Sequence, residues 1–129
     1  MTDPYLSENA GKKGVITTPS GLQYRIIKKG KGKSPRTSDT VTVHYEGKLT
    51  DGTVFDSSYK RGKPLKFKVS GVVKGWTEAL LMMNKGSVWE LFIPPELGYG
   101  SKGVPNVIPP NAVLIFKVEL IKPRASFFG

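Results

Sequence analysis

The sequence lacks cysteine and is poor in histidine. Its 129 residues contain no cysteine and one histidine, His44. Without cysteine, disulfide frameworks, cysteine–zinc sites and thiol nucleophiles are excluded. His44 lies on the polar phase of an alternating segment, so we expect it to face solvent, and neither a Ser-His-Asp triad nor a common zinc site is expected. Any catalysis must therefore use other chemistry, and we expect no metal and no cofactor.

Long apolar runs are also missing, and acidic residues are few. No run approaches the roughly 18 residues that span a bilayer, so we expect no membrane insertion. Ten acidic residues against 20 Lys and Arg give a formal net charge of +10. Such a charge is compatible with nucleic acid as a partner, but the charges are dispersed along the sequence and no nucleic-acid-binding motif accompanies them. We favour a solvated basic surface and expect no nucleic-acid binding.

Alternating apolar and polar residues predict several short strands. The clearest covers residues 41–49, and the turn Asp51-Gly52 leads from it into Val54-Phe55, which is typical of a hairpin. Residues 76–83 change to the helical period and predict one amphipathic helix of two to three turns. Further strands are predicted at about residues 22–27, 65–69, 88–93 and 114–120. The predicted fold is α+β: an antiparallel five- to six-stranded sheet wrapped around one short amphipathic helix.

Residues 94–111 form a long loop rich in glycine and proline. Its five prolines stiffen it, because each fixes φ near −65°. A loop of about eighteen residues is unusual in so small a domain and indicates a functional segment. Its aromatic residue, Tyr99, stands in a glycine-rich stretch where a core ring is not needed. Tyr99 is therefore a candidate functional residue.

Seven sequence blocks, in order, resemble the FK506-binding-protein (FKBP-type) peptidyl-prolyl cis/trans isomerase domain. The blocks are residues 43–47 (VHYEG), 51–58 (DGTVFDSS), 63–64 (KP), 72–76 (VVKGW), 93–100 (IPPELGYG), 108–111 (IPPN) and 114–120 (LIFKVEL). The resemblance extends over about residues 20–122. Three further segments, 6–10 (LSENA), 20–24 (SGLQY) and 75–80 (GWTEAL), are similar to the macrophage-infectivity-potentiator-like branch of that family.

The resemblance implies an isomerase that assists protein folding by rotating X–Pro bonds in an apolar aromatic pocket. Its partners would be proline-containing peptides, unfolded proteins and macrolides of the FK506 and rapamycin type. The residues alone indicate only an apolar binding module, and a non-catalytic peptide- or protein-binding module on the same fold is the alternative.

The resemblance also implies a domain organisation. Residues 1–18 are expected to be a flexible or partly helical lead-in, residues 19–123 the isomerase domain, and residues 124–129 a tail. In the resembling branch a long N-terminal helical arm often precedes the domain and dimerises it. Only the end of such an arm is expected here, so we expect the chain as given to be monomeric. The branch favours a bacterial periplasmic or cell-surface location.

Site residues follow from the resemblance by position. Tyr99 would donate its hydroxyl, Asp56 would position polar groups, Trp76 would form the pocket floor and Phe55 a wall. The expected substrate-binding residues are Tyr45, Arg61 (near Asp56 and Tyr45), Leu65, Val72, Val73 (through its backbone N–H), Val107, Ile108 and Phe116. Two positions depart from the small cytosolic members of the family: Leu65 replaces an aromatic wall, and Val104 stands where histidine is frequent. These departures concern substrate preference and macrolide affinity.

Overall fold

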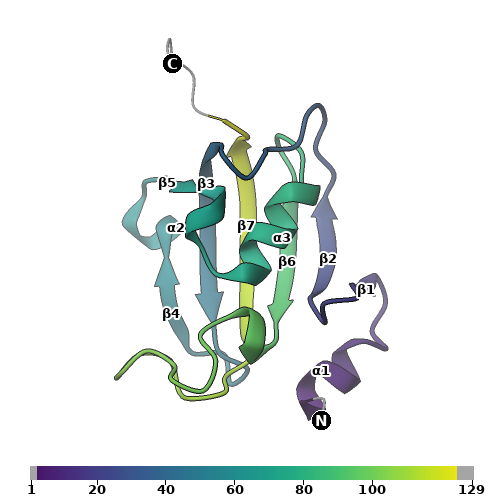
Figure 1. The fold of residues 1–129 in the computed structure, drawn as a ribbon, viewed down its shortest axis with the longest axis vertical. Coiled ribbons are helices and arrows are strands. Elements are labelled where there is room, and N and C mark those ends of the chain that lie inside the picture. Colours follow the sequence, from purple (N-terminus) through teal and green to yellow (C-terminus); the bar gives the residue numbers. More distant parts are fainter. Residues whose placement is uncertain (1–2, 125–129) are drawn as a thin grey trace.

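The computed structural model describes residues 3–124 and is built on one antiparallel sheet (Figure 1). Its strands are β1 (Val15–Thr17), β2 (Gln23–Lys28), β3 (Thr40–Lys48), β4 (Val54–Ser57), β5 (Leu65–Lys68), β6 (Val88–Ile93) and β7 (Leu114–Lys122). They are ordered β1-β2-β6-β7-β3-β4, and β5 also pairs with β3. The predicted α+β class is confirmed, and the short β1, which was not predicted, brings the sheet to seven strands.

The helices are α1 (Pro4–Asn9), α2 (Ser58–Arg61) and α3 (Lys74–Met82), with 3₁₀ turns η1 (Val69–Gly71) and η2 (Pro95–Leu97). Within residues 3–124, no helix is both long and apolar enough to cross a bilayer. The predicted amphipathic helix is α3, which begins two residues before the expected start. The predicted tail falls outside the described residues except for Arg124.

Strand β3 contributes one complete face to the hydrophobic core. Its residues alternate strictly between buried and half-buried, with Val41, Val43 and Tyr45 buried toward the concave face. This alternation is what a strand with one covered face requires, because successive side chains point to opposite sides. His44, on the other face, is half-buried: its Nδ1 lies 2.8 Å from Ser58 Oγ, and its ring stacks on Tyr59.

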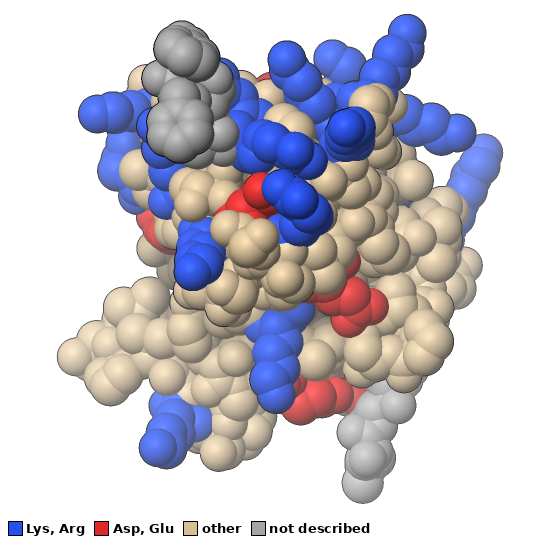
Figure 2. Space-filling view, turned by 45° about the horizontal axis from the view of Figure 1, so that its top comes forward, with Lys and Arg blue, Asp and Glu red and all other residues tan. Residues whose placement is uncertain are grey.

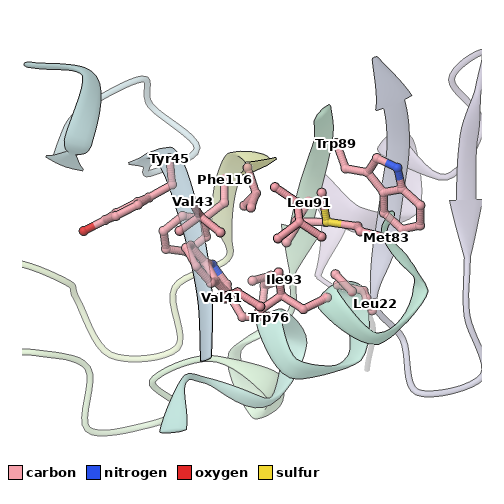
Figure 3. Packing of buried hydrophobic residues seen from close by; sticks show 14 of the residues in the cluster. Leu22, Val41, Val43, Tyr45, Trp76, Met83, Trp89, Leu91, Ile93 and Phe116 are labelled. Carbon is pink, nitrogen blue, oxygen red and sulfur yellow. The ribbon is translucent and has the colours of Figure 1, made fainter. Parts of the chain in front are cut away.

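Helix α3 covers the concave face and closes the core (Figure 1). Trp76, Ala79 and Leu80 are buried on its inner side, and Figure 3 shows Trp76 among the side chains of the sheet. Gly75 lets the helix approach β6 closely, since a Cβ at this position would lie 2.9 Å from the side chain of Ile93. A larger residue at 75 would push the helix off the sheet.

Helix α1 packs on the opposite face of the sheet. Leu6 is buried there against Phe92, Val113 and Ile115, which form a second, smaller cluster. A buried hydrogen bond from Asn9 Nδ2 to Gln23 Oε1 (2.8 Å), with Gln23 Nε2 donating to the Leu6 carbonyl (2.9 Å), fixes the end of the helix. The lead-in is therefore attached to the domain through both apolar and polar contacts.

Candidate active site

A cavity of about 460 Å³ opens on the concave side of the sheet, beside the start of α3. Six of its lining residues are aromatic, and Asp56 carries the one carboxylate among them. The lining residues are Tyr45, Phe55, Asp56, Phe67, Gly71, Val72, Val73, Trp76, Tyr99 and Phe116. Such a mostly apolar cavity with few polar groups is the usual form of a small-ligand site.

Trp76 is the centre of an aromatic box. Its ring centroid lies 5.2 Å from that of Tyr45, 5.7 Å from Phe67 and 5.3 Å from Phe116, and all three pairs are nearly perpendicular. Edge-to-face contacts of this kind each stabilise by about 0.5–1.5 kcal/mol beyond area burial. Trp76 is 4% exposed, and its Nε1–H has no hydrogen-bond acceptor among the described residues. The box is therefore closely packed and mostly apolar.

Gly47 on β3 makes room for two of the walls. A Cβ at this position would lie 2.6 Å from the ring of Phe55 and 2.6 Å from the ring of Phe116. These two rings contact edge to face, with centroids 5.5 Å apart. The sequence shows glycine inside a strand, which often marks close packing, but only the structure shows which rings occupy the space.

A polar group of three residues forms one rim of the pocket. Tyr45 donates its hydroxyl to Asp56 Oδ2, and Arg61 Nη1 forms an ion pair with Asp56 Oδ1. Arg61 Nη2 also donates to the Tyr45 hydroxyl at 3.1 Å. Helix α2, which the sequence analysis did not anticipate, brings Arg61 back over Asp56. The Asp56 side chain is 38% exposed and paired with Arg61, so this rim of the pocket is half-open to solvent.

The electrostatics of this rim fix its protonation. Burial by itself would raise the pKa of Asp56, but the Tyr45 hydroxyl and the Arg61 guanidinium outweigh it and hold the pKa below its usual value. Burial, followed by the hydrogen bond to Asp56, raises the pKa of Tyr45. At neutral pH the carboxylate is therefore charged, and Tyr45 keeps the proton that it donates.

Tyr99 and Val73 present donors at the pocket. Tyr99 is 43% exposed on the long loop, and its hydroxyl has no hydrogen-bond partner within residues 3–124. The backbone N–H of Val73, the residue that caps α3, also has no acceptor in this part of the chain. Both groups are thus available to a ligand in the cavity.

The pocket brings together eight of the twelve predicted site residues. A ninth, Arg61, does not line the cavity but reaches its rim through Asp56 and Tyr45. Leu65 packs against the core instead, and Val107 and Ile108 line a separate hollow on the long loop, with Val107 exposed and Ile108 buried. Val104 closes that part of the loop by a bridge to Ile108.

Phe67 and Gly71 line the pocket and were not predicted. Phe67 lies two residues after Leu65 on the same face of β5, and its larger ring reaches the cavity where Leu65 does not. The alternation of Leu65, Phe67 and Val69 was the signal for this face. It identified the strand, but not which of the three side chains reaches the cavity.

Comparison with known proteins gives a consistent result. The family model described as FKBP-type peptidyl-prolyl cis-trans isomerase matches residues 31–121. A second one, for the domain amino terminal to FKBP-type peptidyl-prolyl isomerase, matches residues 2–26. Peptidyl-prolyl cis-trans isomerase Mip of Coxiella burnetii is 55% identical over 93% of this chain and 52% of its own length. The FKBP-type 22 kDa peptidyl-prolyl cis-trans isomerase of Escherichia coli is 57% identical over 92% of this chain and 57% of its own length.

A solved structure shows the same fold. The crystal structure of FkpA from Escherichia coli matches with a TM-score of 0.88 and 51% identity, covering 94% of this chain and 57% of that one. The chain spans about half the length of the curated relatives that it matches. By sequence and by fold, the chain belongs to the FKBP-type peptidyl-prolyl cis-trans isomerase family, in its Mip-like branch.

Proposed function

We propose that this chain catalyses the cis/trans isomerisation of X–Pro bonds in polypeptides, and so assists protein folding. We also propose that the same pocket binds macrolides of the FK506 and rapamycin type. The observation that carries the proposal is a mostly apolar aromatic box bordered by two donors, Tyr99 and Val73, that have no acceptor within residues 3–124. Rotation about an X–Pro bond forms and breaks no covalent bond, so a nucleophile is not required.

The aromatic walls account for the main part of the rate effect. The barrier to rotation, about 18–20 kcal/mol, comes from the loss of amide resonance. Water stabilises the planar, charge-separated amide, whereas the twisted amide has a less polar carbonyl. With the prolyl ring over Trp76 and between Phe55 and Phe116, the amide loses this hydration before it twists. The pocket then favours the twisted form over the planar one.

The donors hold the substrate while the bond rotates. The Tyr99 hydroxyl and the Val73 N–H, which both border the cavity, would donate to carbonyl groups of the bound chain on either side of the prolyl ring. Asp56, held by Arg61, keeps the ring of Tyr45 in position through the hydroxyl that Tyr45 donates. These contacts fix the chain on one side of the rotating bond, which is what selective stabilisation of the twisted form requires.

The test is an isomerisation assay with and without macrolide. Uncatalysed X–Pro exchange takes tens to hundreds of seconds at 25 °C, and we expect micromolar protein to shorten it for a Leu-Pro peptide. Rapamycin in excess should return the rate to the uncatalysed value, because it would occupy the same box. Macrolide binding without any acceleration would instead identify a non-catalytic binding module. No acceleration and no binding would contradict both parts of the proposal.

Tyr99→Phe should lower kcat/KM by up to about tenfold and leave the melting temperature unchanged. The change removes one hydroxyl donor but keeps the ring, and a neutral hydrogen bond contributes about 0.5–1.5 kcal/mol net, where roughly 1.4 kcal/mol is one decade in rate. Tyr59→Phe is the matched control, because the Tyr59 hydroxyl donates to Glu119 on the outer face of the sheet. Equal rate losses in both variants would remove the Tyr99 hydroxyl from the site.

A further inference from the structure

Half of the basic residues gather at one end of the molecule. Figure 2 shows Lys and Arg side chains crowded over the upper part of the surface, with few acidic ones between them. Four segments meet there, residues 28–40, 65–69, 83–88 and 120–124, and we call them the basic end. They contain ten of the 20 Lys and Arg and one of the ten Asp and Glu. The charges dispersed along the sequence are therefore concentrated in space, and nearly all of the net charge lies here.

Hydrogen bonds join the four segments into one surface. All ten of their Lys and Arg side chains are exposed. The connecting backbone bonds run from Lys31 N to Lys85 O (3.0 Å), from Gly86 N to Leu120 O (2.8 Å) and from Val69 N to Asp39 O (3.0 Å). The basic end is thus a fixed feature of the fold, although its segments are far apart in the sequence.

Folding does not explain this arrangement. Strand pairing places Lys66 and Lys122 on either side of Thr42, and an isolated bridge sets Lys31 opposite Lys85. Like charges directly opposite each other, as Lys31 and Lys85 are, are unfavourable in a sheet. The single acidic residue, Asp39, is already engaged by Arg36, whose Nε lies 3.5 Å from its carboxylate. With ten basic residues and one acidic residue in its four segments, this surface is suited to an anionic partner.

The basic end is continuous with the pocket wall through β5. Phe67 of this strand lines the pocket, while its neighbours Lys66 and Lys68 are exposed. Residues 57–77, which supply one side of the pocket, contain six Lys and Arg and no acidic residue. Within the described part of the chain β5 pairs with β3 alone, so its other edge carries no strand. A substrate that leaves the pocket along β5 passes the exposed Lys66 and Lys68.

We propose that this pocket prefers polypeptide segments with acidic residues near the X–Pro bond, and that Lys66 and Lys68, with the rest of the basic end, determine this preference. The inference rests on the proposed isomerase function and names the substrate class of the same site. Three extended residues span about 10 Å, which is comparable to the thickness of one layer of sheet. A carboxylate a few positions from the proline can therefore reach β5 while the prolyl ring occupies the box.

The composition of the surface favours an acidic polypeptide over nucleic acid. No large apolar or aromatic side chain of the four segments is exposed, and their one aromatic residue, Phe67, faces the pocket. The surface thus offers no ring for base stacking, on which single-strand binding depends. Eight of the ten cations are lysines, mobile point charges that suit carboxylates at variable positions. Direct continuity with the pocket also gives the lysines access to the same chain that the pocket binds.

The experiment compares Leu-Pro peptides of equal length by exchange spectroscopy. One peptide has Gln on both flanks, one has Glu before the Leu-Pro pair, and one has Glu after it. At about 10 mM ionic strength, where charges act over about 30 Å, we expect about tenfold higher kcat/KM for at least one Glu peptide than for the Gln peptide. The gain should appear in KM, and it should vanish at about 1 M salt, where the screening length is about 3 Å.

Two charge-reversal variants localise the effect. In Lys66→Glu/Lys68→Glu the Glu-to-Gln ratio should fall to about one or below. The same ratio should keep its original value in Lys12→Glu/Lys13→Glu, which makes an equal charge change at two exposed lysines after α1. Circular dichroism checks that both variants are folded.

Three results overturn the proposal. The first is a Glu-to-Gln ratio of kcat/KM near one in the unaltered protein at low salt, and the second is an equal fall of this ratio in both variants. The third is a ratio near one together with submicromolar binding of duplex DNA. The last result would assign the basic end to nucleic acid. Catalysis of the Gln peptide reports the proposed function separately. If no peptide is isomerised, the isomerase proposal fails, whereas uniform catalysis of all three peptides removes only the acidic preference.

Discussion

Trp76→Ala should lower the free energy of unfolding by about 3–5 kcal/mol and abolish both isomerisation and macrolide binding. The indole is 4% exposed, and removal of a fully buried large aromatic side chain leaves a cavity that costs about this amount. Its N–H has no acceptor among the described residues, so no hydrogen bond is lost with the ring. The free energy comes from chemical denaturation followed by circular dichroism, and the activity is measured per folded molecule.

Trp89→Ala is the control that separates packing from function. Trp89 is 6% exposed and stacks on Tyr24 at 4.4 Å, on the side of the core away from the pocket (Figure 3). Its loss should destabilise the fold to a similar degree and leave turnover per folded molecule unchanged. If both variants lost turnover in proportion to stability, Trp76 would be a core residue without a part in the site. If only Trp76→Ala lost both stability and turnover per folded molecule, the result would support Trp76 as the pocket floor.

The periodicity of apolar residues predicted those strands and helices that have one buried face. Strand β3 and helix α3 each bury one side, so their apolar residues recur at intervals of two or of three to four, and both elements lie where the pattern placed them. Helix α2 was missed because four residues are too short to show a period. The order of the strands in the sheet could not be predicted either, because pairing between distant segments leaves no pattern in the local sequence.

The site was predictable only in part, for the same reason. The aromatic residues at 45, 55, 76, 99 and 116 could be assigned through resemblance, and all five line one cavity. Resemblance also put Arg61 near Asp56 and Tyr45, and in the structure Arg61 pairs with the half-exposed Asp56, but the helix α2 that carries Arg61 there was not predicted. The basic end was not predicted as one surface, because strand pairing brings together lysines such as Lys66 and Lys122, which are 56 residues apart in the chain.

Gly103→Ala should lower kcat/KM by about ten- to hundredfold through the loop that carries Tyr99. Gly103 has φ of +60°, and a Cβ there would lie 2.3 Å from the Ile108 carbonyl oxygen and 2.8 Å from the Pro109 backbone. Backbone atoms cannot turn aside as a flexible side chain can, so the bridge between Val104 and Ile108 must open. Because Gly103 N–H donates to the Tyr99 carbonyl at 3.1 Å, the same movement displaces Tyr99 from the pocket.

Gly100→Ala provides a control with the same backbone strain and no clash. Gly100 lies in the same loop with the same φ of +60°, and the nearest atom to its added Cβ is 3.9 Å away. Both variants carry the cost of alanine in the left-handed region, about 1–2 kcal/mol, and only Gly103→Ala adds the contact with the backbone at 108 and 109. Activity and melting temperature should therefore fall further in Gly103→Ala than in Gly100→Ala. Equal losses of activity would show that the backbone strain of alanine causes the effect. The bridge between Val104 and Ile108 would then not be what holds Tyr99 at the pocket.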